Sequence, residues 1–259
     1  MRSKTIPADA ELIRTYDELR EFHESFFRGE ISFLLLQGRA GLGKSVEFEA
    51  SCKPRKDRDG NPYTIAHYVK GNVTPVEAYK LAYENRDKLL VFDDAERLWA
   101  DRNGRYLLRD LTENKPRKTV SWRTANKELA SQGIPKSFET SSRVCLIMNR
   151  FDFGGAHEYD AIVDRAQFVY FDPSPLEIHK NTALWFYDQE VFDFIGNHLQ
   201  AVDPNKLSSR AYVKAHERKL MGNWQQLLIN SCFSQSSEEW VLALESNSKW
   251  SISQMMTGF

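Results

Sequence analysis

A short glycine-rich segment has the residue types and spacing that bind phosphate groups. Residues 38–45 match the pattern G-x-x-x-x-G-K-[ST] in full and directly follow the apolar run 31–36. The glycines let backbone N–H groups turn toward a polyphosphate, and the helix that follows would present its own unpaired N–H groups to the same anion. Lys44 would neutralise the β- and γ-phosphates of ATP, and Ser45 would hold Mg²⁺. The predicted cofactors are therefore ATP and Mg²⁺, bound in this segment by Gly38, Gly41, Gly43, Lys44, Ser45 and Val46.

Two carboxylates at the end of a second apolar run would complete the metal site. Residues 89–92 are apolar and are followed by Asp93 and Asp94, so a strand there would deliver both carboxylates to the C-terminal edge of the same sheet. Asp93 would reach Mg²⁺ through its water shell, and Asp94 would orient or deprotonate the attacking water. The alternative interpretation is a strand followed by an ordinary solvated turn.

Two further polar residues flank later apolar runs. Asn149 follows the run 144–148 and would hydrogen-bond the γ-phosphate or the attacking water. Arg165 precedes the run 167–171 and would act on the nucleotide of a neighbouring subunit. Without a nucleotide site, Asn149 would be an ordinary strand-ending residue and Arg165 a surface arginine.

The apolar runs that would position these residues alternate with helical patterns. Strands are expected at residues 31–36, 64–69, 88–92, 144–148 and 167–171. Strands that alternate with helices predict an α/β fold with a parallel sheet covered on both faces. An amphipathic helix is expected over residues 8–28, and the polar segment 53–62 is expected to be an exposed turn.

The pattern changes near Pro173 and Pro175. Beyond them, helical spacing with little strand signal covers residues 182–199, 209–220, 224–233 and 238–244. A domain boundary is expected here because two prolines interrupt any continuing element. The predicted organisation is an N-terminal helix packed on the core (1–30), an α/β nucleotide-binding core (31–174) and a helical domain (175–259).

Composition restricts the partners and the compartment. The chain has 259 residues and a formal net charge of −1, which excludes a uniformly basic nucleic-acid coat and requires any such contact to come from a local patch. Cys52, Cys145 and Cys232 are far apart and predict buried thiols in a reducing compartment. The sequence has neither a signal-peptide pattern at its start nor an apolar run of membrane-spanning length, so a soluble, cytoplasmic protein without membrane contact is expected.

The order of these signals resembles that of the AAA+ family of ATPases over most of the chain. Residues 38–45 resemble its Walker A motif, residues 89–94 its Walker B motif, and Asn149 its sensor 1 residue. Arg165 matches the arginine-finger position, and Arg210 resembles the sensor 2 arginine, which binds the cofactor. The resemblance implies a three-layer P-loop NTPase core with a five-stranded parallel sheet, and a C-terminal all-helical lid. It also implies ATP hydrolysis by a homo-oligomeric ring or filament in which Arg165 acts in trans.

One position departs from the family pattern. The second Walker B carboxylate is usually Glu, whereas this chain has Asp94, which is one methylene shorter. Glu96, two residues further on, is the alternative partner of the attacking water, so both are predicted catalytic residues beside Asn149 and Arg165. The shorter side chain bears on the rate of hydrolysis more than on nucleotide binding.

A basic segment before residue 144 is a candidate nucleic-acid contact. Its position resembles that of the hairpin inserted before sensor 1 in some DNA-acting AAA+ proteins. The cations would contact phosphates and the tryptophan would stack on a base; the residues are Lys115, Arg117, Lys118, Trp122 and Arg123. The preferred alternative is an extra edge strand with a buried Trp122 and solvated lysines.

Three functions stay open on these grounds. The first is an ATPase that remodels or loads factors on nucleic acid, as in replication, transposition or phage functions. The second is a protein-remodelling ATPase, for which residues 68–71 come near an aromatic-hydrophobic-Gly pore loop but contain the extra Lys70. The third is a nucleotide-dependent scaffold or switch that binds ATP and barely turns it over. The feature that supports this third function is Asp94 in place of Glu.

Overall fold

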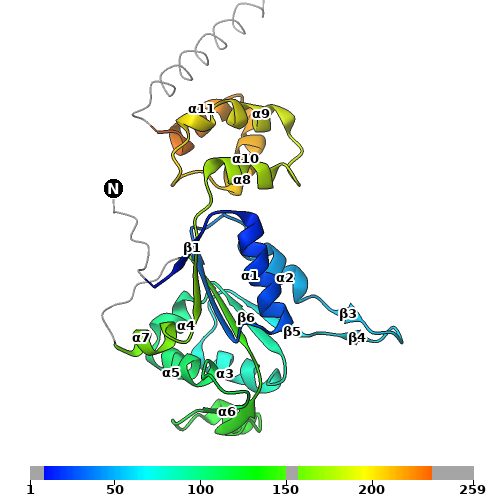
Figure 1. The fold of residues 1–259 in the computed structure, drawn as a ribbon, viewed down its shortest axis with the longest axis vertical. Coiled ribbons are helices and arrows are strands. Elements are labelled where there is room, and N and C mark those ends of the chain that lie inside the picture. Colours follow the sequence, from blue (N-terminus) through cyan, green and yellow to red (C-terminus); the bar gives the residue numbers. More distant parts are fainter. Residues whose placement is uncertain (1–8, 150–156, 235–259) are drawn as a thin grey trace, which may run out of the picture. The chain divides into compact units, whose positions relative to one another are not determined.

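The structure, a computed structural model, describes residues 9–149 and 157–234 (Figure 1). Within these residues the chain divides into two compact units. The first runs to Asp172, except for residues 14–16 and 40–43, and the second consists of those two short segments and the chain from Pro173 onward.

A six-stranded parallel sheet, in the order β1-β10-β2-β9-β6-β5, forms the centre of the first unit. Its strands are β1 (Glu11–Ile13), β2 (Phe33–Gly38), β5 (Ala66–Lys70), β6 (Leu89–Asp93), β9 (Val144–Met148) and β10 (Gln167–Phe171). β2 and β9 are buried along their whole length, as expected for strands of a parallel sheet covered on both faces. The predicted α/β fold with a parallel sheet is confirmed.

The sheet has one strand more than the five predicted. The residues expected to open an amphipathic helix at position 8 instead place β1 in parallel register with the last three residues of β10. Ile13 is buried there, and the pairing satisfies backbone groups that an open edge of β10 would leave unpaired. The helix, α1 (Tyr16–Arg28), therefore begins at residue 16.

Helices cover both faces of this sheet (Figure 1). Besides α1 they are α2 (Val46–Ser51), α3 (Pro75–Glu84), α4 (Glu96–Ala100), α5 (Arg102–Leu111) and α7 (His157–Val163). Alternate residues of the central strands, among them Leu35 and Phe92, pack in one hydrophobic core with buried side chains of α3, α4 and α5. On the other side of the sheet, α1 and α2 contact each other through Phe26 and Phe48. The first unit is thus a three-layer helix–sheet–helix structure.

Two antiparallel hairpins are separate from the main sheet. β3 (Arg55–Lys56) pairs with β4 (Pro62–Tyr63) between α2 and β5. β7 (Lys118–Ser121) pairs with β8 (Ser137–Thr140) between α5 and β9, and α6 (Lys127–Ser131) lies in their connection. The exposed turn expected at residues 53–62 is therefore a two-stranded ribbon.

The second unit, as far as residue 234, is helical. It contains α8 (Pro175–Thr182), α9 (Gln189–Asn197), α10 (Ser209–Arg218) and α11 (Trp224–Cys232), with two short 3₁₀ helices, Leu199–Ala201 and Lys219–Met221. The helix expected over residues 182–199 is shorter, Gln189–Asn197, because Asp188 caps its start by accepting a hydrogen bond from Val191 N. The helix expected at 238–244 lies outside the described residues. In the described part of the chain, no helix has the length and apolarity needed to span a membrane.

Candidate nucleotide-binding site

Lys44, the residue before the last of the glycine loop (residues 38–45), is held against the first two carbonyls of that loop. Its Nζ donates to Gly38 O at 2.7 Å and to Arg39 O at 2.8 Å, and the residue is only 6% exposed. A side chain at residue 38 is excluded, because a Cβ there would lie 2.6 Å from Phe171 O. The ammonium group is therefore fixed at the carboxyl end of β2, the edge at which parallel sheets bind ligands.

Ser45 and Asp93, the two predicted metal ligands, are brought together. Ser45 Oγ donates to Asp93 Oδ1 at 2.9 Å, although β9 lies between β2 and β6 in the sheet. A hydroxyl and a carboxylate side by side are hard oxygen ligands of the kind that Mg²⁺ takes, with its other positions left to water and phosphate oxygens. The residues present therefore fit a Mg²⁺-nucleotide complex.

Tyr68, on the neighbouring strand β5, is a site residue that the sequence analysis did not find. Its hydroxyl donates to Asp93 Oδ2 at 2.6 Å, so both oxygens of the carboxylate are oriented. Burial first, and then the hydrogen bond to Asp93, raise the pKa of Tyr68 and keep its hydroxyl protonated as a donor. In the sequence Tyr68 is one residue of an ordinary strand pattern, and only the β5–β6 pairing places it beside Asp93.

Asn149 connects the loop to the second carboxylate. Its Oδ1 accepts from Lys44 Nζ at 3.2 Å, and its Nδ2 donates to Asp94 Oδ1 at 3.0 Å. Lys44, Asn149 and Asp94, taken from three separate parts of the sequence, thus form one hydrogen-bonded chain. A side chain in this position can bind a phosphate oxygen or a water between the lysine and the carboxylate.

The two candidate partners of the attacking water have different environments. Glu96 Oε1 accepts a hydrogen bond from Asn149 N at 2.7 Å, which anchors the backbone of the sensor residue. Asp94 is exposed and has φ 57°, in the left-handed region that non-glycine residues rarely adopt and that often marks functional sites. The geometry therefore favours Asp94 as the residue that faces water and Glu96 as the residue that positions Asn149.

Within the second unit, the start of α10 contacts the middle of the glycine loop. Ser209 donates to Gly41 O from both its backbone N, at 3.1 Å, and its Oγ, at 2.7 Å. A Cβ on Gly41 would lie 3.0 Å from Ser208 Cβ and 3.4 Å from Arg210 Cδ, which is tight. The φ of Gly41, +78°, also favours glycine at this close approach. Arg210 is thus packed beside a loop residue, and Ser209 is a further contact that sequence reasoning missed.

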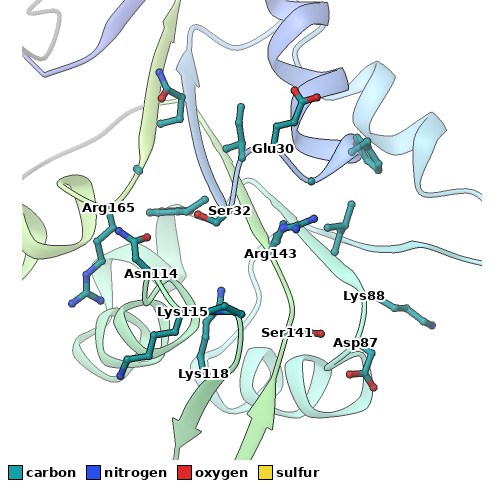
Figure 2. A pocket seen from close by; sticks show the side chains of 18 of the residues that line it. Glu30, Ser32, Asp87, Lys88, Asn114, Lys115, Lys118, Ser141, Arg143 and Arg165 are labelled. Carbon is teal, nitrogen blue, oxygen red and sulfur yellow. The ribbon is translucent and has the colours of Figure 1, made fainter.

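Arg165 lies at the amino ends of the parallel strands, whereas Lys44 lies at their carboxyl ends. It precedes β10, whose last residue pairs with Gly38, and the five residues of β10 span about 17 Å at roughly 3.3 Å per residue. Arg165 Nη1 donates to Arg109 O, near the end of α5, at 2.8 Å. Its side chain lines a pocket at the amino ends of the strands (Figure 2), and the volume of this pocket is about 990 Å³. Arg165 therefore cannot reach the nucleotide of its own chain.

The basic segment 115–123 is mostly not available for nucleic acid. Trp122 is only 8% exposed and packs against the ring of Tyr79, with centroids 5.5 Å apart. Lys118 is 3% exposed, and its Nζ donates to Leu111 O and Ser142 O. The preferred alternative of a buried Trp122 is confirmed, and the ring does not stack on a base because it fills the core under the β7–β8 hairpin. The solvated Lys118 of that alternative is wrong, because its ammonium group binds a carbonyl at the end of α5. Burial lowers the pKa of Lys118 to about 8.

The remaining cations of that segment are at the surface. Lys115 pairs with Glu113 at 2.6 Å, and Arg117 pairs with Glu139 at 3.6 Å. Arg123 is exposed. The Tyr68–Gly71 stretch, considered as a pore loop, has its aromatic hydroxyl bound to Asp93.

The sheet, the glycine loop after β2 and the carboxylate that ends β6 define the fold of a P-loop NTPase. The structure is similar to NtrX from Brucella abortus in complex with ATP, with 16% identity and a TM-score of 0.42 over 85% of this chain and 53% of the NtrX chain. It is also similar to the FIGL-1 AAA domain in complex with ADP, with 15% identity and a TM-score of 0.41 over 87% of this chain and 76% of that one. This chain thus spans about half of the length of NtrX. No protein-family model and no curated protein matches the sequence.

Proposed function

We propose that this protein is an AAA+ ATPase that binds and hydrolyses ATP with Mg²⁺. The observation that carries the proposal is the single hydrogen-bonded network of Lys44, Asn149 and Asp94 beside the Ser45–Asp93 pair. Glycine-rich loops followed by Lys and Ser, with an acidic residue at the end of a neighbouring strand, serve phosphoryl transfer. The sequence resemblance to AAA+ proteins adds the assignment of Asn149, Arg165 and Arg210.

Each residue has a distinct part in the proposed reaction. Lys44 would balance charge on the β- and γ-phosphates, while Ser45 and Asp93, oriented by Tyr68, would hold the metal. Bound Mg²⁺ would supply charge stabilisation for the transferring phosphoryl group. Asp94 would accept a proton from the attacking water, and Asn149 would hold that water or the γ-phosphate in line. Arg210 would add a cation at the loop.

The finer proposal is that hydrolysis drives remodelling or loading of a nucleic-acid-associated assembly by a homo-oligomer. The support for this finer proposal is the sequence resemblance. A nucleotide-dependent scaffold that turns ATP over slowly is the second candidate, favoured by the short Asp94 side chain. A protein-remodelling role loses its main sequence indication, because the Tyr68 hydroxyl is bound to Asp93.

A turnover assay tests the function directly. Phosphate release from ATP should require Mg²⁺ and should rise when a nucleic acid is added; single-stranded DNA, duplex DNA and RNA are tested separately. Binding of ATP without measurable phosphate release under any of these conditions would favour the scaffold. Absence of both binding and release would reject the proposal.

The roles of the two acids near the water can be separated by matched amide variants. Asp94→Asn should leave ATP binding intact and slow hydrolysis by about 10²- to 10⁴-fold, because it keeps the side-chain size and removes the basic oxygen. Glu96→Gln should have a smaller effect, because an amide oxygen can still accept from Asn149 N. Single-turnover phosphate release and ATP titration on both variants give the comparison. Normal turnover in Asp94→Asn together with loss in Glu96→Gln would reverse the assignment.

A further inference from the structure

The β3–β4 ribbon, residues 53–63, is exposed at every residue. Its two strands pair only with each other, with Arg55 opposite Tyr63 and Lys56 opposite Pro62. It extends from the first unit between α2 and β5 (Figure 1). An isolated two-stranded ribbon is only marginally stable by itself in water. Because every residue of this ribbon is exposed, a bound partner could stabilise it and would find all of its side chains accessible.

The tip of the ribbon is rigidly built. Asp57 Oδ1 accepts from Asp59 N at 2.9 Å and from Asn61 N at 2.8 Å, and Asp57 N donates to Asn61 O at 3.0 Å. The hydrogen bonds from Asn61 lead the causes that lower the pKa of Asp57. Gly60 provides the positive φ, +85°, that the turn requires. One of the two carboxylates of the ribbon is therefore used inside the turn rather than presented to a partner.

The cationic side chains of the ribbon, unlike Asp57, make no hydrogen bonds within the turn. They are Lys53, Arg55, Lys56 and Arg58. Within the part of the chain that the structure describes, none of these four side chains has an ion-pair or hydrogen-bond partner. Arg55 and Lys56 are adjacent in β3, so their side chains point to opposite faces of the ribbon. Asp59 is the single carboxylate left beside them, and the ribbon is a local basic surface on a chain of net charge −1.

We infer that the β3–β4 ribbon is a docking surface for duplex DNA. Four unpaired cations on both faces of a narrow element suit two rows of phosphates better than they suit a flat acidic protein surface. The two strands are about 4.8 Å apart, and the B-DNA major groove, about 12 Å wide, admits a two-stranded ribbon. The deep, narrow major groove of duplex RNA does not admit one. Tyr63, 44% exposed, is placed to contact a base edge or a phosphate.

The position of the ribbon in the chain connects it to the proposed metal site. It follows α2, the helix that begins directly after Ser45, and it leads into β5, which carries Tyr68. Lys70 of β5 and Glu49 of α2 lie 3.6 Å apart as an ion pair. DNA on the ribbon would thus act on α2, which directly follows Ser45, and on β5, whose Tyr68 binds Asp93. The coupling to turnover rests on the proposed ATPase function, whereas DNA binding by the ribbon does not.

Binding is tested with the full chain, without nucleotide, and with a labelled duplex of about two helical turns, or roughly 21 bp. The ribbon variant combines Arg55→Gln, Lys56→Gln and Arg58→Gln. Its matched control combines Lys115→Gln, Arg117→Gln and Arg123→Gln, which removes the same charge from the surface of the β7–β8 region. Thermal unfolding of both variants checks that the fold is kept, as expected for exposed positions.

The ribbon variant should lose roughly tenfold or more in affinity near 50 mM salt, and its log Kd–log salt slope should become shallower by about 2.7, or 0.9 for each cation removed. The control should keep a near wild-type slope. Equal losses in the two variants, an unchanged slope in the ribbon variant, or tighter binding of single-stranded DNA or duplex RNA than of duplex DNA would overturn the inference. So would failure of the wild type to bind any nucleic acid.

ATP turnover on the same preparations separates this inference from the proposed function. The ribbon variant should keep basal turnover and lose its stimulation by duplex DNA. Stimulation equal to that of wild type would contradict the coupling. A wild type that binds DNA through the ribbon but never hydrolyses ATP would reject the ATPase and leave the docking surface standing.

Discussion

Replacing Lys44 by Ala should lower the affinity for ATP about a hundredfold or more. The ammonium group is held at the carboxyl end of β2 by two loop carbonyls and by Asn149, so little ordering is required before it meets phosphate oxygens. A hydrogen bond between charged groups is worth about 1.5 to 3 kcal/mol, and loss of one or two reaches that factor. Calorimetric titration with ATP, in Mg²⁺ and after chelation, measures the change.

Two further variants keep this prediction specific. Lys44→Met preserves most of the packing of the buried stem and removes only the charge, so it should lose affinity as Lys44→Ala does. Lys127→Ala removes an exposed lysine of α6 and should bind ATP like the wild type. Equal affinity for wild type and Lys44→Met would contradict the assignment of the loop. Loss of affinity only in variants that also melt at lower temperature would mean that Lys44 supports the fold rather than the phosphates.

The central strands could be predicted because burial on both faces of the sheet requires a continuous run of apolar residues. β9 and β10 lie where the continuous apolar runs predicted them, since each is bounded by polar residues and covered on both faces. β2 was placed two residues early. Gln37 and Gly38 continue the pairing with Tyr170 and Phe171, although a polar residue and a glycine give no strand signal. β1 was missed because three residues that pair with an edge strand cannot be distinguished from the first turn of a helix by spacing alone.

The residues of the candidate site can likewise be separated into those that the sequence could predict and those that it could not. The proximity of Ser45 and Asp93 could be predicted because a phosphate loop has a fixed spacing and a carboxylate at the end of a parallel strand lies at the same edge of the sheet. Tyr68 and Ser209 were missed because their contacts depend on strand pairing and on the fold of the helical unit. Lys118 was misjudged for a related reason. Its charge suggested an exposed side chain, but the carbonyl groups of Leu111 and Ser142 accept its hydrogen bonds in the interior.

Hydrolysis should depend on assembly of several copies, with Arg165 of one copy serving the nucleotide of another. The length of β10 separates Arg165 from its own loop, so any catalytic action of this arginine must be in trans. An arginine that stabilises the transferring phosphoryl group supplies roughly 10³- to 10⁵-fold in rate, or about 4 to 7 kcal/mol. Specific activity should therefore rise with protein concentration, and Arg165→Ala should lose most of it while still binding ATP.

Arg165 also has a structural contact, because it donates to Arg109 O near the end of α5, and a mixing experiment separates the two roles. Arg165→Ala has an intact nucleotide site without the arginine, and Lys44→Ala has the arginine without a working site. At a mixed interface the Lys44→Ala copy offers its Arg165 to the site of the Arg165→Ala copy, so a mixture should recover activity that neither variant has alone. A purely structural role predicts a lower melting temperature for Arg165→Ala and no recovery on mixing. Turnover that is independent of concentration in a protein that sediments as a monomer would exclude action in trans.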